Sequence, residues 1–288
     1  MNQNFTKWAL AIVGIVSIIA LFVAVKPGKQ EAIESSNVID KVLQSQTLRA
    51  SYIVYSPYFI KDPNSGKLSG IFYDVTELVG KKLGLKVDWT GEVGYEDIYA
   101  GLDSGRYDVY AGGLWPGATR AKVGYFSTPV FYSVIKAWGR TDDHRFDNNL
   151  SAINSPDVRI ATIDGAMEDI IAKADFENAE RVSLPQLSPF SQNFLNITSG
   201  KADVTFAEPS GVHLFLKTNP GTLREIAPNQ PLRIFGNSLV LKRGEDEFKQ
   251  MIDTALNEAL FSGEIDKILK KYEASPDEFP RPALPYAN

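Results

Sequence analysis

The chain has 288 residues, of which 44% are hydrophobic and 23% charged, so it is long enough to form two globular domains with packed cores. Its net charge is −5, and no cluster of basic residues stands out beyond the first residues of the chain. Both observations argue against a nucleic-acid partner. The absence of cysteine excludes disulfides and thiolate chemistry, and His144 and His213 lack metal-ligand spacing, so we expect no metal and no cofactor.

The N-terminal segment is strongly apolar. Residues 8–25 carry no charge and lie between Lys7 and Lys26, which is close to the minimum length for a membrane span. No small-x-small cleavage site follows them. We therefore predict that residues 1–30 are a signal anchor and tether that hold a soluble domain on the periplasmic or extracellular face of a membrane. A cleaved export signal, which would give a secreted protein, is the alternative.

The first part of the soluble chain, residues 36–138, alternates between strand and helix patterns. Gly84 stops the main amphipathic helix, and a turn at residues 62–66 separates two extended segments. This alternation predicts a mostly parallel sheet covered by helices. The predicted strands are 48–54, 86–89 and 108–110, and the predicted helices are 38–43, 70–83 and 95–102.

One loop in this part has the composition of a small-molecule pocket. The stretch 111–129 follows an apolar strand, is expected to lose regular structure at its glycines, and places Arg120 at the carboxyl end of that strand. The planar guanidinium matches a carboxylate in two parallel hydrogen bonds. A solvated surface arginine is the alternative interpretation.

A second α/β unit, residues 139–235, repeats this organisation. Apolar extended segments at 134–138 and 237–242 bracket it, which predicts a double crossing between two lobes and a natural hinge. Residues 236–275 are expected to return to the first lobe and end in two amphipathic helices, and residues 276–288 to form an irregular tail. The predicted elements of the second unit are strands at 158–162, 182–184 and 202–206, and helices at 166–174, 190–197 and from 209 onward.

Motifs along residues 36–272 resemble those of extracellular solute-binding protein family 3, the amino-acid-binding components of ABC transporters. That resemblance implies the two-lobed clamshell of type II periplasmic binding proteins, an α/β fold. It rests on the order and spacing of the motifs together. They are Leu48-Arg49, Tyr55-Ser56-Pro57-Tyr58-Phe59, Asp74, Lys81-Lys82-Leu83-Gly84, Gly105-Arg106-Tyr107-Asp108, Arg120 before Phe126-Ser127, Gly200-Lys201-Ala202-Asp203, and Ser262-Gly263-Glu264-Ile265-Asp266-Lys267-Ile268.

The resemblance also implies ligand-binding residues. The arginine matching Arg120 binds the α-carboxylate of an amino acid, and the acidic residue matching Glu208 receives the α-ammonium group. Aromatic residues matching Tyr55 and Tyr95 enclose the ligand side chain. All of these are expected near strand ends that face the cleft, where such folds bind ligands.

Several positions depart from the family pattern. Gly113 and Trp115 replace two hydroxyl residues, although the backbone N–H of Gly113 remains a donor. Ala166 and Met167 replace another hydroxyl pair, where backbone N–H groups at a helix N-terminus can still meet an anion. Tyr52 and Phe72 stand where acidic residues are frequent.

These departures predict an aromatic pocket that is less suited to a cationic or strongly polar side chain. Tyr52, Tyr55, Tyr95 and Trp115 would form a cage for an apolar, aromatic or methylated-ammonium group. Ordinary packing in the core is the alternative for each of them.

We therefore predict a monomeric, non-enzymatic protein that binds an amino acid or related zwitterionic or carboxylate solute between two lobes and delivers it to an ABC transporter permease. A ligand-sensing domain is an alternative, although no signalling domain is present. A binding-protein-like enzyme such as a dehydratase is another; Glu208 could act as an acid or base, but no histidine or lysine is placed to work with it.

Overall fold

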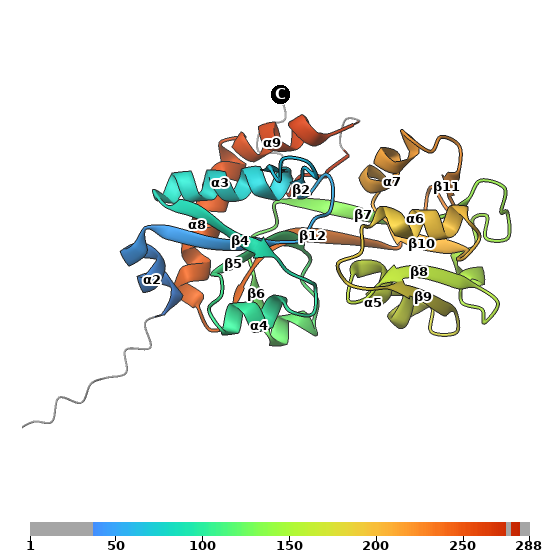
Figure 1. The fold of residues 1–288 in the computed structure, drawn as a ribbon, viewed down its shortest axis with the longest axis horizontal. Helices are drawn as coiled ribbons and strands as arrows, with labels where there is room; N and C mark the ends of the chain where they lie inside the picture. The colour runs from blue at the N-terminus through green and yellow to red at the C-terminus, as the bar shows by residue number, and fades with distance from the viewer. Residues whose placement is uncertain (1–36, 275–277, 283–288) are drawn as a thin grey trace, which may run out of the picture. The chain divides into compact units, whose positions relative to one another are not determined.

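The computed structural model describes residues 37–274 and 278–282 and has a two-lobed α/β fold, as predicted (Figure 1). The strands are β1 (Thr47–Tyr52), β2 (Ile60–Lys61), β3 (Leu68–Ser69), β4 (Lys86–Glu92), β5 (Val109–Leu114), β6 (Gly124–Phe126), β7 (Phe131–Arg140), β8 (Arg159–Ile163), β9 (Glu180–Leu184), β10 (Val204–Ala207), β11 (Leu223–Glu225) and β12 (Arg233–Lys242). The helices are α2 (Val38–Ser45), α3 (Ile71–Leu83), α4 (Ile98–Asp103), α5 (Met167–Asp175), α6 (Ser191–Thr198), α7 (Pro209–Leu216), α8 (Asp246–Phe261) and α9 (Glu264–Tyr272). Short 3-10 turns occupy Arg120–Lys122 and Leu150–Ile153.

The predicted signal anchor lies outside the described residues. Within residues 37–274 and 278–282, no helix combines the length and the hydropathy that a membrane crossing requires.

Lobe 1 is built on the parallel strands β4, β1 and β5, with β12 added antiparallel to β5. Successive residues of β5 face opposite sides of the sheet, as the pleat of a strand requires. Val109 and Ala111 join a core with α3, α8 and α9, whereas Tyr110 joins a second core with α4. Helices therefore lie against both faces of this sheet, which explains why β5 is buried along nearly its whole length.

Lobe 2 follows the same plan in the strand order β7, β10, β8 and β9. Strand β10 is antiparallel to β7 and parallel to β8. Ile160 and Phe206 contribute to the core under α5, while their neighbours Ala161 and Ala207 contribute to the core under α6 and α7.

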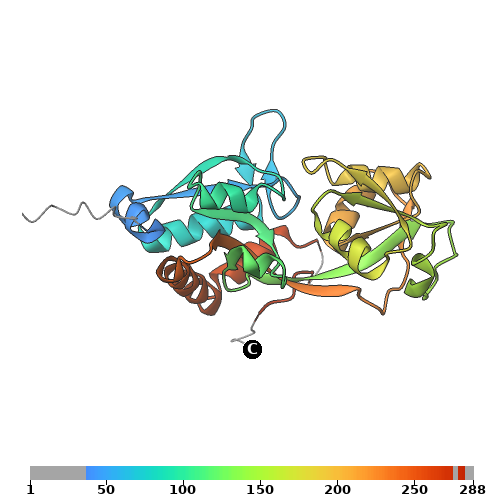
Figure 2. The ribbon, with the colours of Figure 1, turned by 90° about the horizontal axis from the view of Figure 1, so that it is seen from below.

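Two long strands connect the lobes. Strands β7 and β12 pair antiparallel from Arg233 opposite Ile135 to Asn237 opposite Phe131, and Figure 2 shows them running side by side between the two groups of elements. The later residues of β12 pair with β5 and β6 in lobe 1, and the later residues of β7 pair with β10 and β11 in lobe 2. The predicted double crossing is thus one continuous two-stranded ribbon.

Both lobes contain the same arginine–aspartate brace. In lobe 1, Asp108 accepts hydrogen bonds from the backbone N–H of Arg49 at 2.9 Å and from its guanidinium at 2.6 Å. In lobe 2, Asp203 accepts from the backbone N–H of Arg159 at 2.9 Å and from its Nε at 3.0 Å. Each aspartate ends a Gly-x-x-Asp motif just before a central strand, so these motifs hold the sheets together.

The observed elements differ from the predicted ones at several places. Strand β5 continues through Gly112 and Gly113 to Leu114, because Ser238 of β12 pairs with Leu114. Strands β7 and β12 are ten residues long each, since each serves both lobes. Strand β11 was not predicted, and α4 begins at Ile98 instead of near Tyr95.

Candidate ligand-binding site

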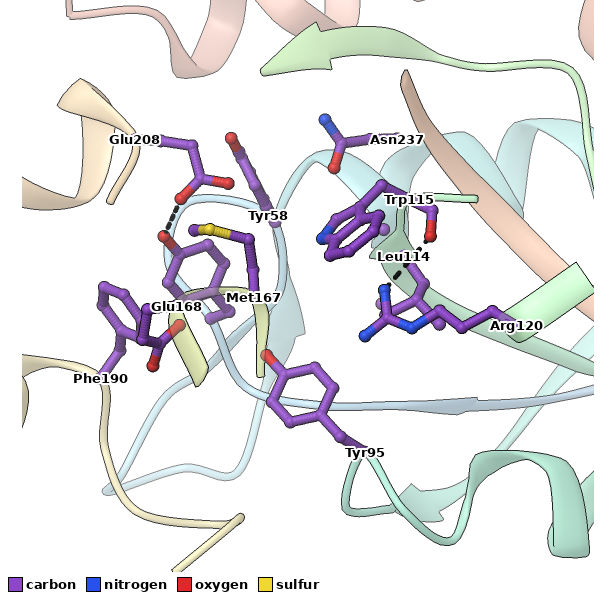
Figure 3. A pocket seen from close by; sticks show the side chains of 13 residues that line it. Tyr58, Tyr95, Leu114, Trp115, Arg120, Met167, Glu168, Phe190, Glu208 and Asn237 are labelled. Atoms are coloured by element: carbon purple, nitrogen blue, oxygen red, sulfur yellow. Dashed lines mark hydrogen bonds between the residues drawn. The ribbon is translucent and has the colours of Figure 1, made fainter. Parts of the chain in front are cut away.

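The candidate site is a pocket that both lobes line (Figure 3). Lobe 1 contributes the end of β5 and the loops that follow β1 and β4; lobe 2 contributes the N-terminal ends of α5, α6 and α7. The space between these groups, including the part open to solvent, is about 420 Å³. Its lining residues are Tyr55, Tyr58, Tyr95, Gly112, Gly113, Leu114, Trp115, Arg120, Met167, Glu168, Phe190, Glu208 and Asn237.

Arg120 is held in the pocket with donors to spare. Its Nη1 donates to the Trp115 carbonyl at 3.2 Å, and its Nη2 donates to the Gly165 carbonyl of lobe 2 at 3.4 Å. Its Cζ lies 4.2 Å from the centre of the Trp115 ring, a cation–π contact. Among the described residues it pairs with no carboxylate, and burial lowers its pKa. An anion entering the pocket would meet a partly desolvated guanidinium that has no carboxylate partner among the described residues.

Glu208 lies on the opposite side of the pocket from Arg120 (Figure 3). It is the N-cap residue of α7 and is buried, and burial raises its pKa. The Tyr55 hydroxyl of lobe 1 donates a hydrogen bond to its carboxylate. The predicted ammonium acceptor therefore already has one partner from the other lobe.

A polar network beside the pocket reaches the connecting strands. The Tyr58 hydroxyl and the Ser133 hydroxyl lie 2.8 Å apart, and Asn237 Nδ2 donates to Ser133 Oγ at 2.6 Å. Ser133 belongs to β7 and Asn237 to β12. Tyr58 and Asn237 line the pocket but were not predicted to do so, although an asparagine at the start of an apolar extended segment is a signal.

The predicted aromatic cage is only partly present. Tyr55, Tyr95 and Trp115 line the pocket; the Tyr55 ring packs edge-on against Phe190 with ring centres 4.7 Å apart. Tyr52 instead lies in the lobe 1 core, 4% exposed, and stacks on Phe59 at 4.2 Å. Tyr52 is therefore a core residue and does not line the pocket, as the alternative interpretation of this tyrosine predicts.

Gly113 and Phe72 both depart from the family pattern, and they are neighbours in the structure. Gly113 has φ +76°, and a Cβ atom there would lie 2.3 Å from Cε2 of Phe72. The Phe72 ring therefore fills the space that a side chain at position 113 would need.

The N-terminal end of α5 offers fewer free donors than expected. Ala166, the N-cap residue, is buried, and its N–H donates to the Ile163 carbonyl at 3.0 Å. The N–H of Gly165 donates to Asp169 at 3.2 Å. Ala166 does not line the pocket, whereas Met167 does.

Glu168, in the first turn of α5, is the most consequential residue that the sequence analysis missed. It is 1% exposed, and its Oε1 accepts hydrogen bonds from the Ile163 N–H at 3.0 Å and from Asn193 Nδ2 at 2.9 Å. Its Oε2 is buried and has no hydrogen-bond partner among the described residues. Burial raises the pKa of this carboxyl to about 8. Acidic residues favour the first turn of any helix, so position alone did not single it out.

Comparison with known proteins gives one consistent family. The family model for bacterial extracellular solute-binding proteins, family 3, matches residues 50–275. A probable amino-acid ABC transporter-binding protein of Haemophilus influenzae is 27% identical over 194 residues, which are 67% of this chain and 72% of that protein. The L-cystine-binding protein TcyA of Bacillus subtilis is 26% identical over 221 residues, 76% of this chain and 77% of that protein.

Two further matches have links to enzymes. The crystal structure of the ancestral amino acid-binding protein AncCDT-1, described as a precursor of cyclohexadienyl dehydratase, matches with a TM-score of 0.72 and 21% identity over 82% of this chain and 99% of that chain. The membrane-bound lytic murein transglycosylase F of Salmonella paratyphi B is 25% identical over 226 residues, 75% of this chain but only 41% of that protein.

Proposed function

This chain belongs to the bacterial extracellular solute-binding proteins, family 3, and from that premise we propose that it binds an α-amino acid or related zwitterion between its lobes and delivers it to an ABC transporter permease. The names of its Haemophilus influenzae and Bacillus subtilis relatives support amino-acid transport. The family is extracellular, which supports a location on the periplasmic or outer face of the membrane.

The observation that carries this proposal is the pairing of opposite charges across one pocket. Arg120 comes from lobe 1 and Glu208 from lobe 2, and both line the same cavity. A ligand carboxylate bonded to Arg120 gains two charge-assisted hydrogen bonds, each contributing roughly 1.5–3 kcal/mol. The ligand ammonium then pairs with Glu208. Because the two groups sit on different lobes, only a zwitterion satisfies both and favours the closed arrangement.

The Tyr55 hydrogen bond sets the environment in which the ammonium binds. Glu208 accepts from Tyr55 through one carboxylate oxygen, Oε2. The other oxygen is the acceptor we assign to the ligand. A cation there favours the ionised form of Glu208 against the burial that raises its pKa.

The remaining assignments extend this proposal. The anchor at residues 8–25 would hold the protein near its permease, and the protein would act as a monomer. We divide the soluble chain into lobe 1, residues 36–138 and 236–275, and lobe 2, residues 139–235; the pairing of β7 with β12 supports these limits. A role in binding without catalysis is supported by the family and by the names of the Haemophilus influenzae and Bacillus subtilis relatives.

A thermal-shift screen of the full chain against the twenty amino acids, betaines and small carboxylates tests the proposal. A ligand at ~100 times its dissociation constant should stabilise the protein by about 2.7 kcal/mol. If no α-amino acid or other zwitterion raises the melting temperature, the assignment is wrong. Chemical conversion of a candidate ligand during the incubation would show that the protein is an enzyme and not only a binding protein.

A further inference from the structure

The unpartnered oxygen of Glu168 is the feature of the pocket that a simple zwitterion does not explain. Arg120 accounts for a ligand carboxylate and Glu208 for an α-ammonium. Glu168 lines the same pocket with a second buried carboxyl group. Its Oε2 has no hydrogen-bond partner among the described residues, whereas buried polar atoms in proteins are nearly always bonded.

Two hydrogen bonds fix the orientation of the Glu168 carboxyl group. The Ile163 N–H and Asn193 Nδ2 both bond Oε1, at 3.0 and 2.9 Å, so the orientation of the group is set by α6 and the end of β8. Oε2 could reach these two donors only if the carboxyl group rotated and broke both bonds to Oε1. Figure 3 places the carboxyl group beside the Phe190 ring and across the pocket from Arg120.

The charges of the lining residues point to the missing partner. Arg120 contributes one positive charge, while Glu168 and Glu208, when ionised, contribute two negative charges. When both glutamates are ionised, a neutral zwitterion leaves one buried carboxylate uncompensated. A ligand with a carboxylate and two cationic groups leaves none, which matters because an uncompensated buried charge is costly.

We propose that Glu168 is the specificity-determining residue for the ligand side chain, and that the pocket takes an α-amino acid whose side chain ends in an ammonium or guanidinium group. The inference rests on the proposed function. The terminal donor bonds Glu168 Oε2, and the apolar stem of the side chain packs on the Tyr55 and Phe190 rings. This reverses the sequence-based expectation that the pocket is poorly suited to a cationic side chain.

Among the described residues, no cationic side chain forms an ion pair with Glu168. On its own helix, Asp169 is bonded to Lys173 at 2.6 Å and to Arg181 of β9 at 2.5 Å. Glu208, at the start of α7, raises the pKa of Glu168 further, after the larger effect of burial. From lobe 1, the pocket receives the hydroxyls of Tyr55 and Tyr95 and the guanidinium of Arg120.

Proton release follows from this arrangement. Without ligand, the Glu168 carboxyl has a pKa of about 8 and carries a proton at pH 6. A cationic side chain favours the ionised form, so binding drives that proton off. Affinity for such a ligand should therefore rise with pH up to about 8.

The test compares L-lysine with L-norleucine, which lacks only the terminal ammonium, by titration calorimetry with the full chain. Glu168→Gln keeps an acceptor for the two Oε1 donors and removes the charge. It should weaken L-lysine roughly 10- to 100-fold, the loss of one charge-assisted hydrogen bond, and change L-norleucine less than about threefold. Glu177→Gln, an exposed residue beyond the other end of α5, is the matched control and should change neither. Circular dichroism checks that each variant is folded.

The wild-type protein provides a second readout that needs no variant. Its preference for L-lysine over L-norleucine should grow between pH 6 and pH 8. A preference that falls with pH would mean that a protonated Glu168 donates to the ligand, which overturns the inference. Equal affinity for both amino acids, or equal weakening of both by Glu168→Gln, overturns it while the proposed function stands. If no amino acid binds the wild-type protein, the proposed function fails and this inference fails with it.

Discussion

Replacing Arg120 with methionine should separate ligand binding from stability. The substitution removes all five guanidinium donors but keeps an unbranched side chain beside the Trp115 ring. Two charge-assisted bonds to a carboxylate contribute roughly 3–6 kcal/mol together, so affinity should fall about 10²- to 10⁴-fold at 1.4 kcal/mol per factor of ten.

The ligand-free protein should tolerate the same change. Arg120 loses two long hydrogen bonds to carbonyls, at 3.2 and 3.4 Å, but a desolvated charge disappears with them. These effects oppose each other, so the free energy of unfolding should change by only about 1 kcal/mol.

Calorimetry should use the amino acid that stabilises the protein most, together with the same compound as its carboxamide. Arg120→Met should weaken the amino acid strongly and the carboxamide little, which gives a coupling energy between arginine and carboxylate. Arg106→Met, an exposed arginine of the same lobe, is the control. Undiminished affinity in Arg120→Met, or equal losses for the amino acid and the carboxamide, would place the carboxylate elsewhere.

Three other outcomes are expected. Folding raises the pKa of Glu168 from 4.5 to about 8, so its contribution to stability is complete below pH 4.5 and is lost as pH rises toward 8. The melting temperature of the ligand-free protein should therefore fall between pH 4.5 and pH 8. Glu168→Gln should flatten this dependence of melting temperature on pH. Gly113→Ala combines a positive φ with a steric clash and should cost about 2–4 kcal/mol in denaturant unfolding, whereas Gly105→Ala, at φ +69° with open space, should cost only about 1 kcal/mol. Tyr55→Phe removes the donor to Glu208 and should lower the free energy of unfolding by about 1–3 kcal/mol; an unchanged value would show that the bond contributes nothing without ligand.

Much of the fold was predictable because it depends on local patterns. Gly84 ends α3 in a left-handed conformation, and Pro209 begins α7 at the position where a missing N–H does no harm. Arg120 and Glu208 both follow strands whose carboxyl ends face the mouth of an α/β lobe, and the family resemblance supplied their expected roles. The structure brings both to one pocket, where their roles in binding stay a prediction.

The rest depends on contacts between distant residues. Glu168 becomes a buried pocket residue because Asn193, on another helix, bonds one of its oxygens. Tyr52 lies in the core because it stacks on Phe59, and no periodicity distinguishes that face from the pocket face for a tyrosine at a strand end. The end of β5 was underestimated because its last residues pair with β12, more than a hundred positions along the chain.

The arginine–aspartate braces have a mechanical consequence. Each joins the beginning of one parallel strand to the loop before its neighbour, and the pocket lies at the opposite, carboxyl ends of those strands. We expect each lobe, braced at the end of its sheet away from the pocket, to move as one rigid body about the β7–β12 ribbon. In that case the separation between the outer surfaces of the lobes differs between the empty and the occupied cleft, and a partner protein can detect that difference.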